Sequence, residues 1–215
     1  MDMWLDTAEV EVIVRAARQG VLTGVTTNPT ILATAGRPPA EIIPALLKAQ
    51  PGWLTVQVTA AETTAMVAQG KRLRDLSRRI VVKIPMTPAG LEATYTLSQK
   101  DIPVMVTAVV QPQQAWLAHL AGAAYVAPYL GRMLAAGLDG FQILEDMAAL
   151  VRGSHPPTQI IVASVKTLDQ VVGCARAGAH GVTLPGSLFD QLHTHPLTTQ
   201  GLTQFAEAGD QLAGL

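Results

Sequence analysis

Lys83 occupies an unusual position for a lysine, inside the short apolar run Ile80-Val81-Val82-Lys83-Ile84-Pro85. A run with apolar residues on both faces is typical of a strand in a buried parallel sheet. An ammonium group there loses its hydration, which lowers its pKa and favours the neutral amine. A neutral lysine amine is the nucleophile that forms Schiff bases with carbonyl substrates. We therefore predict a Schiff-base lysine; the simpler alternative is a buried ion pair between Lys83 and Asp6.

The fold must bring other polar groups to Lys83, and the chain alternates strand-like with helix-like segments. The predicted strands are Met3–Asp6, Gly24–Thr27, Leu54–Val58, Ile80–Ile84, Val104–Val109, Tyr125–Tyr129, Gln159–Val165 and Gly181–Leu184. The predicted helices are Ala8–Arg18, Ala40–Ala49, Thr63–Leu76, Ala89–Gln99, Gln113–Leu120, Phe141–Val151, Leu168–Ala175 and about Leu197–Leu212.

This alternation predicts an α/β fold, a single (β/α)8 TIM barrel over residues 1–215 with an extra C-terminal helix. A doubly wound open sheet is the alternative. It would require a glycine-rich phosphate loop after the first strand, and Asp6-Thr7-Ala8-Glu9 is not such a loop.

Most of the predicted strands end in a side chain that can ionise or form a hydrogen bond. In a barrel of this type, chemistry takes place at the C-terminal ends of the strands. These residues are Asp6, Asn28, Gln57, Lys83, Thr107, Tyr129, and Ser164 with Lys166. Each has a simpler explanation alone, since Asp6 and Asn28 could merely cap helices. Together they favour an active site.

The residue types suggest how catalysis is divided among the strand ends. Lys83 would attack a ketone, and the resulting iminium would allow the neighbouring C–C bond to break. Tyr129, or a water held by Gln57, Thr107 and Tyr129, would act as general acid and base. Asp6 would orient the intermediate and accept and donate protons during imine formation.

The remaining polar residues suit a phosphorylated sugar. Arg132 and Lys166 offer two cations for a phosphate at the rim of the barrel. Ser164 and Asn28 could form hydrogen bonds with the hydroxyls of a short ketose fragment. Strand alternation places Ser164 and Lys166 on one face, with Val165 pointing away.

Composition narrows the classes of protein and partner. The chain has 215 residues, of which 49% are hydrophobic and 14% charged, with a formal net charge of −1. No apolar run is long enough to span a membrane, and no basic patch indicates nucleic acid binding. The single cysteine, Cys174, can form no internal disulfide and has no metal-ligand spacing. Together with an N-terminus that lacks a secretion signal, this predicts a cytoplasmic protein, and the apolar excess favours a homo-oligomer.

Two segments resemble signatures of the transaldolase family: Gly24-Val25-Thr26-Thr27-Asn28-Pro29-Thr30 and the strand around Lys83. Ala127-Pro128-Tyr129 with Arg132, and Ala163-Ser164-Val165-Lys166-Thr167, extend the resemblance, which is strongest to the short branch that contains bacterial fructose-6-phosphate aldolase.

The resemblance implies a barrel with a Schiff-base lysine and neither a metal nor an organic cofactor. It assigns the Schiff base to Lys83, the strand-one aspartate to Asp6, the signature asparagine to Asn28, phosphate binding to Arg132 and the strand-seven serine to Ser164. It also implies a decamer in which the C-terminal helix, about residues 197–212, packs on a neighbouring subunit.

Within this family, Gln57 and Tyr129 favour an aldolase, because transaldolases carry glutamate and phenylalanine at the matching positions. The predicted reaction converts fructose 6-phosphate to dihydroxyacetone and glyceraldehyde 3-phosphate, and back. Leu130-Gly131-Arg132-Met133 looks more like the transaldolase loop, and Val109-Val110-Gln111-Pro112 also departs from the aldolase pattern. The first alternative is therefore a transaldolase, and the second is a non-catalytic barrel that binds sugar phosphates.

Overall fold

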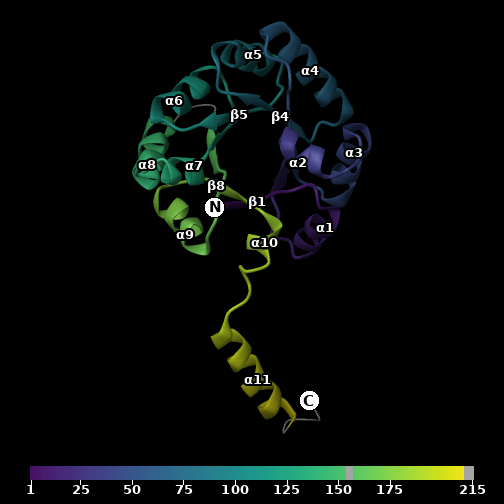
Figure 1. The fold of residues 1–215 in the computed structure, drawn as a ribbon, viewed down its shortest axis with the longest axis vertical. Coiled ribbons are helices and arrows are strands. Elements are labelled where there is room, and N and C mark those ends of the chain that lie inside the picture. Colours follow the sequence, from purple (N-terminus) through teal and green to yellow (C-terminus); the bar gives the residue numbers. More distant parts are fainter. Residues whose placement is uncertain (154–156, 211–215) are drawn as a thin grey trace.

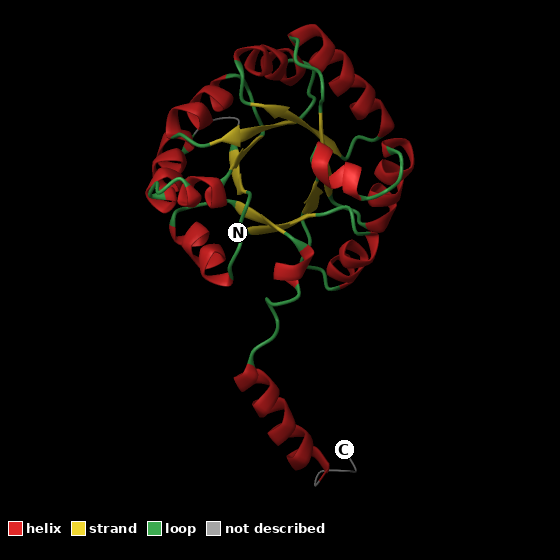
Figure 2. Ribbon diagram, viewed as in Figure 1, coloured by secondary structure: helices red, strands yellow, loops and turns green. Residues whose placement is uncertain are grey.

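Eight parallel strands close into a barrel in the computed structural model, which describes residues 1–153 and 157–210. Neighbouring strands follow the chain order, and β1 pairs with β8 to close the ring (Figure 2). This closure confirms the predicted (β/α)8 TIM barrel and excludes the open sheet. The strands are β1 (Asp2–Asp6), β2 (Gly24–Thr26), β3 (Trp53–Gln57), β4 (Ile80–Pro85), β5 (Val104–Val109), β6 (Tyr125–Pro128), β7 (Gln159–Val162) and β8 (Gly181–Leu184).

Helices surround the barrel on its outer side (Figure 1). Pro29, Pro88 and Pro112 each begin a helix, where the missing N–H group is not needed. Three short helices, α2, α7 and α10, were not predicted. The helices are α1 (Val10–Arg18), α2 (Pro29–Thr34), α3 (Pro39–Ala49), α4 (Thr63–Leu76), α5 (Pro88–Ser98), α6 (Pro112–Leu120), α7 (Leu130–Ala135), α8 (Gly140–Val151), α9 (Leu168–Arg176), α10 (Gly186–Phe189) and α11 (Pro196–Asp210).

The C-terminal helix α11 lies away from the barrel and is joined to it by a short extended segment (Figure 1). Its predicted end at Leu212 falls outside the described residues. Within residues 1–153 and 157–210, no helix has both the length and the apolar character needed to cross a membrane.

Alternate strand residues point into the barrel and form an apolar layer around Trp4. This layer consists of Trp4, Val81, Met105, Ala127 and Ile161, all almost fully buried. The intervening strand residues face the helices and form the outer core. Because strand side chains alternate with a period of two, residues two positions further along lie on the same inner face, nearer the C-terminal mouth.

The end of β7 corrects one prediction. The strand stops at Val162 instead of Val165, and Ser164 has a left-handed backbone with φ of 62°. The alternation that placed Ser164 and Lys166 on one face therefore does not extend to these residues. Val165 is buried among the outer core residues as predicted, whereas Lys166 is exposed.

Gly24 makes room for the Trp4 ring inside the barrel. A Cβ atom at this position would lie 2.6 Å from the Trp4 ring and 2.7 Å from the Trp53 carbonyl oxygen. We expect Gly24→Ala to lower the free energy of unfolding by about 1–3 kcal/mol, because the packed layer has no space for a methyl group. Thermal or urea denaturation would measure the change.

The matched control is Gly209→Ala in α11, where an added Cβ meets no atom within 4 Å. This variant should be neutral or more stable by up to about 1 kcal/mol, because alanine is the better helix former. Equal stability of the two variants would contradict the packing argument at Gly24.

Candidate active site

The Lys83 amine is enclosed by the barrel, and its side chain is 2% exposed. Its Nζ donates a hydrogen bond of 3.1 Å to the Thr27 carbonyl oxygen. Burial lowers the pKa of Lys83, and the negative charge of Asp6 raises it in part. One acceptor suits a neutral amine better than an ammonium group, which has three hydrogens to donate.

Asp6 acts on Lys83 without forming an ion pair with it. The ion pair found in the described part of the chain joins Arg15 to Asp190, so the simple explanation of Lys83 as half of a buried pair with Asp6 is wrong. Instead, Asp6 Oδ1 accepts a hydrogen bond of 2.7 Å from Thr26 Oγ1.

Asp6 does not cap the helix that follows it. Helix α1 begins at Val10 with Glu9 as its N-cap, and the Glu9 N–H donates to Thr7 Oγ1 at 3.1 Å. The carboxylate of Asp6 is therefore not used in capping α1 and is available to act at the barrel mouth. Asp6 lies two residues after Trp4, on the inner face of β1.

Thr107 on β5 and Tyr129 directly after β6 contact each other at the barrel mouth. In the order of the strands they follow Lys83 on β4, whereas Asp6 and Gln57 precede it. Thr107 Oγ1 donates to Tyr129 Oη at 3.0 Å, which leaves the phenol hydrogen free for a substrate or water. The Arg132 guanidinium carbon lies 4.7 Å from the centre of the Tyr129 ring, a cation–π contact. Tyr129 is therefore held at both its hydroxyl and its ring.

The backbone around Tyr129 is fixed by both neighbouring strands. The Tyr129 N–H donates to Val109 O at 3.0 Å, and the Gly131 N–H donates to Ser164 O at 3.1 Å. A Cβ on Gly131 would lie 2.4 Å from that oxygen, so this approach requires glycine. β5 has a register shift beside Ala108, whose φ is 62°. These contacts bring Ser164, Tyr129 and Arg132 to one corner of the mouth.

Gln57 ends β3 directly opposite Lys83 in the register of β3 and β4. Its side chain is partly buried. The observed hydrogen bond at the predicted water site joins Thr107 to Tyr129 and does not include Gln57. Gln57 is thus beside the lysine strand, and its part in holding a water stays a prediction.

Asn28 and Lys166 are joined less directly to the other predicted site residues. Asn28 Oδ1 accepts a hydrogen bond from the Ile31 N–H at 2.9 Å and caps α2, which is the simpler role predicted for it from the sequence. Its amide NH2 group can still donate. The Lys166 N–H donates to Gln170 Oε1 at 2.7 Å, and its side chain is exposed. The structure therefore leaves Lys166 at the periphery instead of joining it to the other residues.

Sequence reasoning missed the two threonines that support Asp6. Thr26 donates to Asp6, and its Oγ1 lies 2.7 Å from Thr183 Oγ1. A signal was available: Thr26 follows Gly24 by two residues, and Thr183 follows Gly181 by two, so both share the inward alternation. Threonine is common in strands, however, and the pairing across β1 depends on closure of the barrel.

A polar cavity of about 880 Å³ opens beside Asp6, between α1 and α2. Charged side chains that line it besides Asp6 are Glu9, Glu11, Arg15, Arg37 and Asp190. Nowhere in residues 1–153 and 157–210 do three or more His, Cys, Asp or Glu side chains gather in a way that could hold a metal ion. The cavity supplies polar space at the mouth, next to the Asp6 carboxylate.

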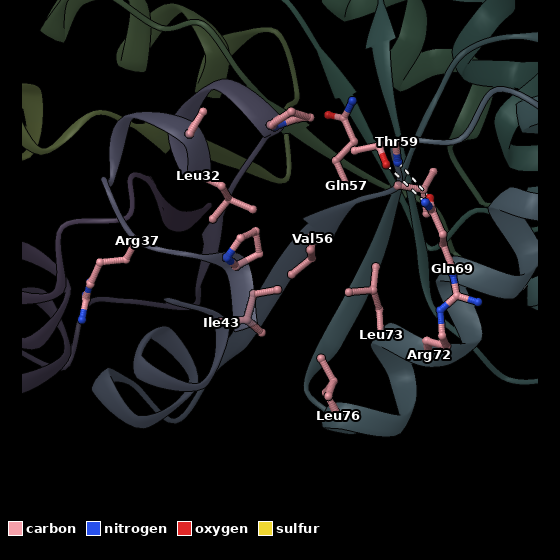
Figure 3. A pocket seen from close by; sticks show the side chains of 14 residues that line it. Leu32, Arg37, Ile43, Val56, Gln57, Thr59, Gln69, Arg72, Leu73 and Leu76 are labelled. Carbon is pink, nitrogen blue, oxygen red and sulfur yellow. Dashed lines mark hydrogen bonds between the residues drawn. The ribbon is translucent and has the colours of Figure 1, made fainter. Parts of the chain in front are cut away.

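A second cavity, here called the outer groove, is apolar and lies outside the barrel between α2, α3 and α4. It measures about 630 Å³ and its lining includes Leu32, Ile43, Val56, Leu73 and Leu76. Figure 3 shows the α2 and α3 side chains on one side and the α4 side chains on the other. The groove does not contain Lys83, but Gln57, one of the predicted catalytic residues, lies at its edge.

Residues 3–213 match the family described as Transaldolase/Fructose-6-phosphate aldolase. The chain belongs to this family. It is 39% identical over 205 residues to a "Probable transaldolase" of Caulobacter vibrioides, covering 95% of this chain and 94% of the relative. It is 40% identical over 214 residues to a "Probable transaldolase" of Coprothermobacter proteolyticus, covering 100% and 99%. The enzymes of this family act in carbohydrate metabolism, and a polar barrel mouth around a buried lysine is compatible with such an enzyme.

A solved structure of a mandelate oxidase mutant with a monooxide FMN adduct shares the fold. Its TM-score is 0.59 at 17% sequence identity, and the match covers 86% of this chain and 64% of that chain. At this identity the likeness concerns the barrel alone.

The lowered pKa of Lys83 leads to a test of its chemical state. Reductive methylation with formaldehyde follows the neutral amine, so its rate at Lys83 should reach half-maximum at a lower pH than the rate for Nα-acetyl-lysine amide in water. Asp6→Asn should lower that half-point further, because the Asp6 charge raises the lysine pKa. Peptide mass spectrometry across a pH series would measure both rates.

Nα-acetyl-lysine amide in the same sample is the internal control, since the Asp6 charge does not act on it. A Lys83 half-point equal to that of Nα-acetyl-lysine amide, or an upward shift in Asp6→Asn, would contradict the electrostatic account.

Proposed function

We propose that this protein is a class I aldolase that cleaves fructose 6-phosphate to dihydroxyacetone and glyceraldehyde 3-phosphate, and joins them in reverse. The observation that carries this proposal is the pairing of a buried Lys83 amine with a Tyr129 hydroxyl held by Thr107. The amine supplies the nucleophile, and the phenol supplies an acid and base in a step where phenylalanine could not.

The reaction begins when Lys83 Nζ attacks the C2 carbonyl of the open-chain ketose. Loss of water from the carbinolamine gives an iminium, and Asp6 lies near enough to Lys83 for its charge to affect this step. Tyr129 takes the proton of the C4 hydroxyl while the C3–C4 bond breaks. The aldehyde leaves, and the bonding electrons remain on C3 as an enamine. Protonation at C3 and addition of water then release dihydroxyacetone and the free amine.

This route needs neither a metal nor an organic cofactor, because the iminium nitrogen itself accepts the electrons of the breaking bond. Arg132, which stacks on Tyr129, is suited to bind the phosphate of the leaving aldehyde. Ser164 lies next to it, and Lys166 adds a second cation at the rim. Asn28 would hold a hydroxyl of the dihydroxyacetone part through its free amide hydrogens.

A transaldolase is the second candidate, and the similarity to relatives named "Probable transaldolase" favours it. A transaldolase uses the same Lys83 enamine but passes it to an acceptor aldehyde before dihydroxyacetone is released. The phenol of Tyr129 favours the aldolase, since it can return to C3 of the enamine the proton that it took from the C4 hydroxyl, after which water adds to the iminium. A non-catalytic barrel would leave Lys83 unreactive. A cytoplasmic location stays a prediction from the sequence.

We also propose that the protein is a homo-oligomer in which α11 of one copy packs into the outer groove of another. Leu197, Leu202 and Phe205 on α11 are 69%, 61% and 73% exposed, an unusual state for large apolar side chains on one helix. The outer groove offers an apolar surface, and a helix held away from its own barrel can reach a neighbour. Such a head-to-tail contact closes into a ring when its rotation permits. A decamer stays an implication of the family resemblance.

Release of free glyceraldehyde 3-phosphate from fructose 6-phosphate, with no acceptor aldehyde present, tests the proposed reaction. An aldolase should give many turnovers. Release of no more than one equivalent per active site, rising to many turnovers only with erythrose 4-phosphate, would instead identify a transaldolase. Absence of a borohydride-trapped dihydroxyacetone adduct on Lys83 would remove both enzyme proposals.

Tyr129→Phe should reduce the cleavage rate by about a hundredfold or more, because it removes the general acid and base. The dihydroxyacetone adduct on Lys83 should still form, since the amine is untouched. Tyr95→Phe on α5 is the control, because Tyr95 is 57% exposed and lies outside the mouth. An unchanged cleavage rate in Tyr129→Phe would show that the phenol has no catalytic part.

The double substitution Leu202→Ser with Phe205→Ser should shift the protein to a smaller species in sedimentation or light scattering, because the apolar contacts of α11 are lost. Gln204→Ser, which changes an exposed polar residue of the same helix, should leave the mass unchanged. A monomeric wild-type protein, or an unchanged mass in the double variant, would refute the packing of α11 on a second copy.

A further inference from the structure

Two buried threonine hydroxyls form a chain that ends on the Asp6 carboxylate. Thr183 Oγ1 and Thr26 Oγ1 lie 2.7 Å apart, and Thr26 Oγ1 lies 2.7 Å from Asp6 Oδ1. Thr26 is 1% exposed and Thr183 is 2% exposed, so solvent does not compete for these hydroxyls. The chain joins three strands, because Thr26 lies on β2 and Thr183 on β8, on either side of β1.

The number of protons fixes the direction of this chain. An ionised carboxylate can only accept, so the hydrogen of Thr26 points to Asp6. Thr26 has no second hydrogen, so the hydrogen between the threonines belongs to Thr183. Both O–H groups therefore point toward the negative charge. A hydroxyl that already accepts one hydrogen bond donates a stronger one.

Asp6 needs such a support because other charges surround it. Lys83 lies on the barrel side. Glu9, Glu11, Arg15, Arg37 and Asp190 line the polar cavity on the other side, and Arg15 is already paired with Asp190. A carboxylate that turned into this cavity would lose its closeness to the lysine.

We propose that Thr183 is a positioning residue, which acts through Thr26 to hold the Asp6 carboxylate toward Lys83. Its part in imine formation rests on the proposed Schiff-base function, whereas its effect on the lysine does not. Thr183 makes no contact with a substrate in this account. It determines where the negative charge next to the amine lies.

Thr183→Val tests the proposal, because valine keeps the shape of threonine and removes the hydroxyl. The Asp6 charge raises the pKa of Lys83, so a displaced carboxylate should lower the pH at which Lys83 methylation is half-maximal. The shift should have the same direction as in Asp6→Asn and be smaller. Thr183→Ser keeps the hydroxyl and should restore the wild-type half-point.

Kinetics with fructose 6-phosphate supply the second measurement. We expect kcat to fall about threefold to tenfold in Thr183→Val, as for a lost hydrogen bond one step from a charged group, with KM changed less than about twofold. Thr94→Val is the control for loss of a buried hydroxyl. Thr94 is fully buried in α5 and donates to the Gly90 carbonyl, so its removal should affect stability and leave the Lys83 half-point unchanged.

An unchanged Lys83 half-point in Thr183→Val, or a shift that Thr183→Ser shares in full, would overturn the proposal. If Thr183→Val fails to fold, Thr183→Ala removes the same hydroxyl and is judged by the same shift. Because methylation needs no substrate, the Thr183–Thr26–Asp6 hydrogen bonds can be tested even if the wild-type protein forms no dihydroxyacetone adduct. Absence of that adduct would refute the proposed function and leave the role of Thr183 to be judged by the methylation half-point.

Discussion

Closure of the barrel takes the Lys83 amine out of water and leaves it one backbone acceptor, the Thr27 carbonyl. The loss of hydration disfavours the ammonium form more than the Asp6 charge can compensate. A fully apolar setting would lower the pKa further, whereas a direct ion pair would restore the charge. The observed arrangement lies between these extremes, since Asp6 influences the amine without a direct bond to it. Nucleophilic chemistry at this position depends on that balance.

The second constraint is the strict alternation of strand side chains. It puts Trp4, Val81 and Met105 in the packed layer of the barrel and, two residues later, Asp6, Lys83 and Thr107 at the mouth. The apolar layer thus serves as a floor that keeps water from reaching the amine from below. Gly24 allows the floor to close, because any larger side chain would collide with the Trp4 ring. The packing that stabilises the barrel and the environment that tunes the lysine are therefore the same feature.

Tyr129 is positioned by a different means, because its strand has already ended. Val109 and Ser164 hold the backbone on either side of it through hydrogen bonds, and a left-handed residue lies at each place, Ala108 within β5 and Ser164 after the end of β7. Non-glycine residues in this conformation carry a steric cost, which is repaid here by backbone hydrogen bonds and the close approach at Gly131. With its backbone held in this way, Tyr129 accepts the hydrogen bond from Thr107 Oγ1 at 3.0 Å.

The sequence by itself determined the barrel fold and the burial of Lys83, because hydrophobic periodicity and a charged residue within an apolar strand are local signals. It also placed β5 and β8 correctly from end to end. It could not determine which polar groups meet, because β1 lies beside β8 only after the whole ring has closed. The Thr183–Thr26–Asp6 chain and the absence of a direct Lys83–Asp6 pair were decided there. The early end of β7 was decided likewise, since a left-handed Ser164 is stabilised by contacts with Gly131 from another strand–helix unit.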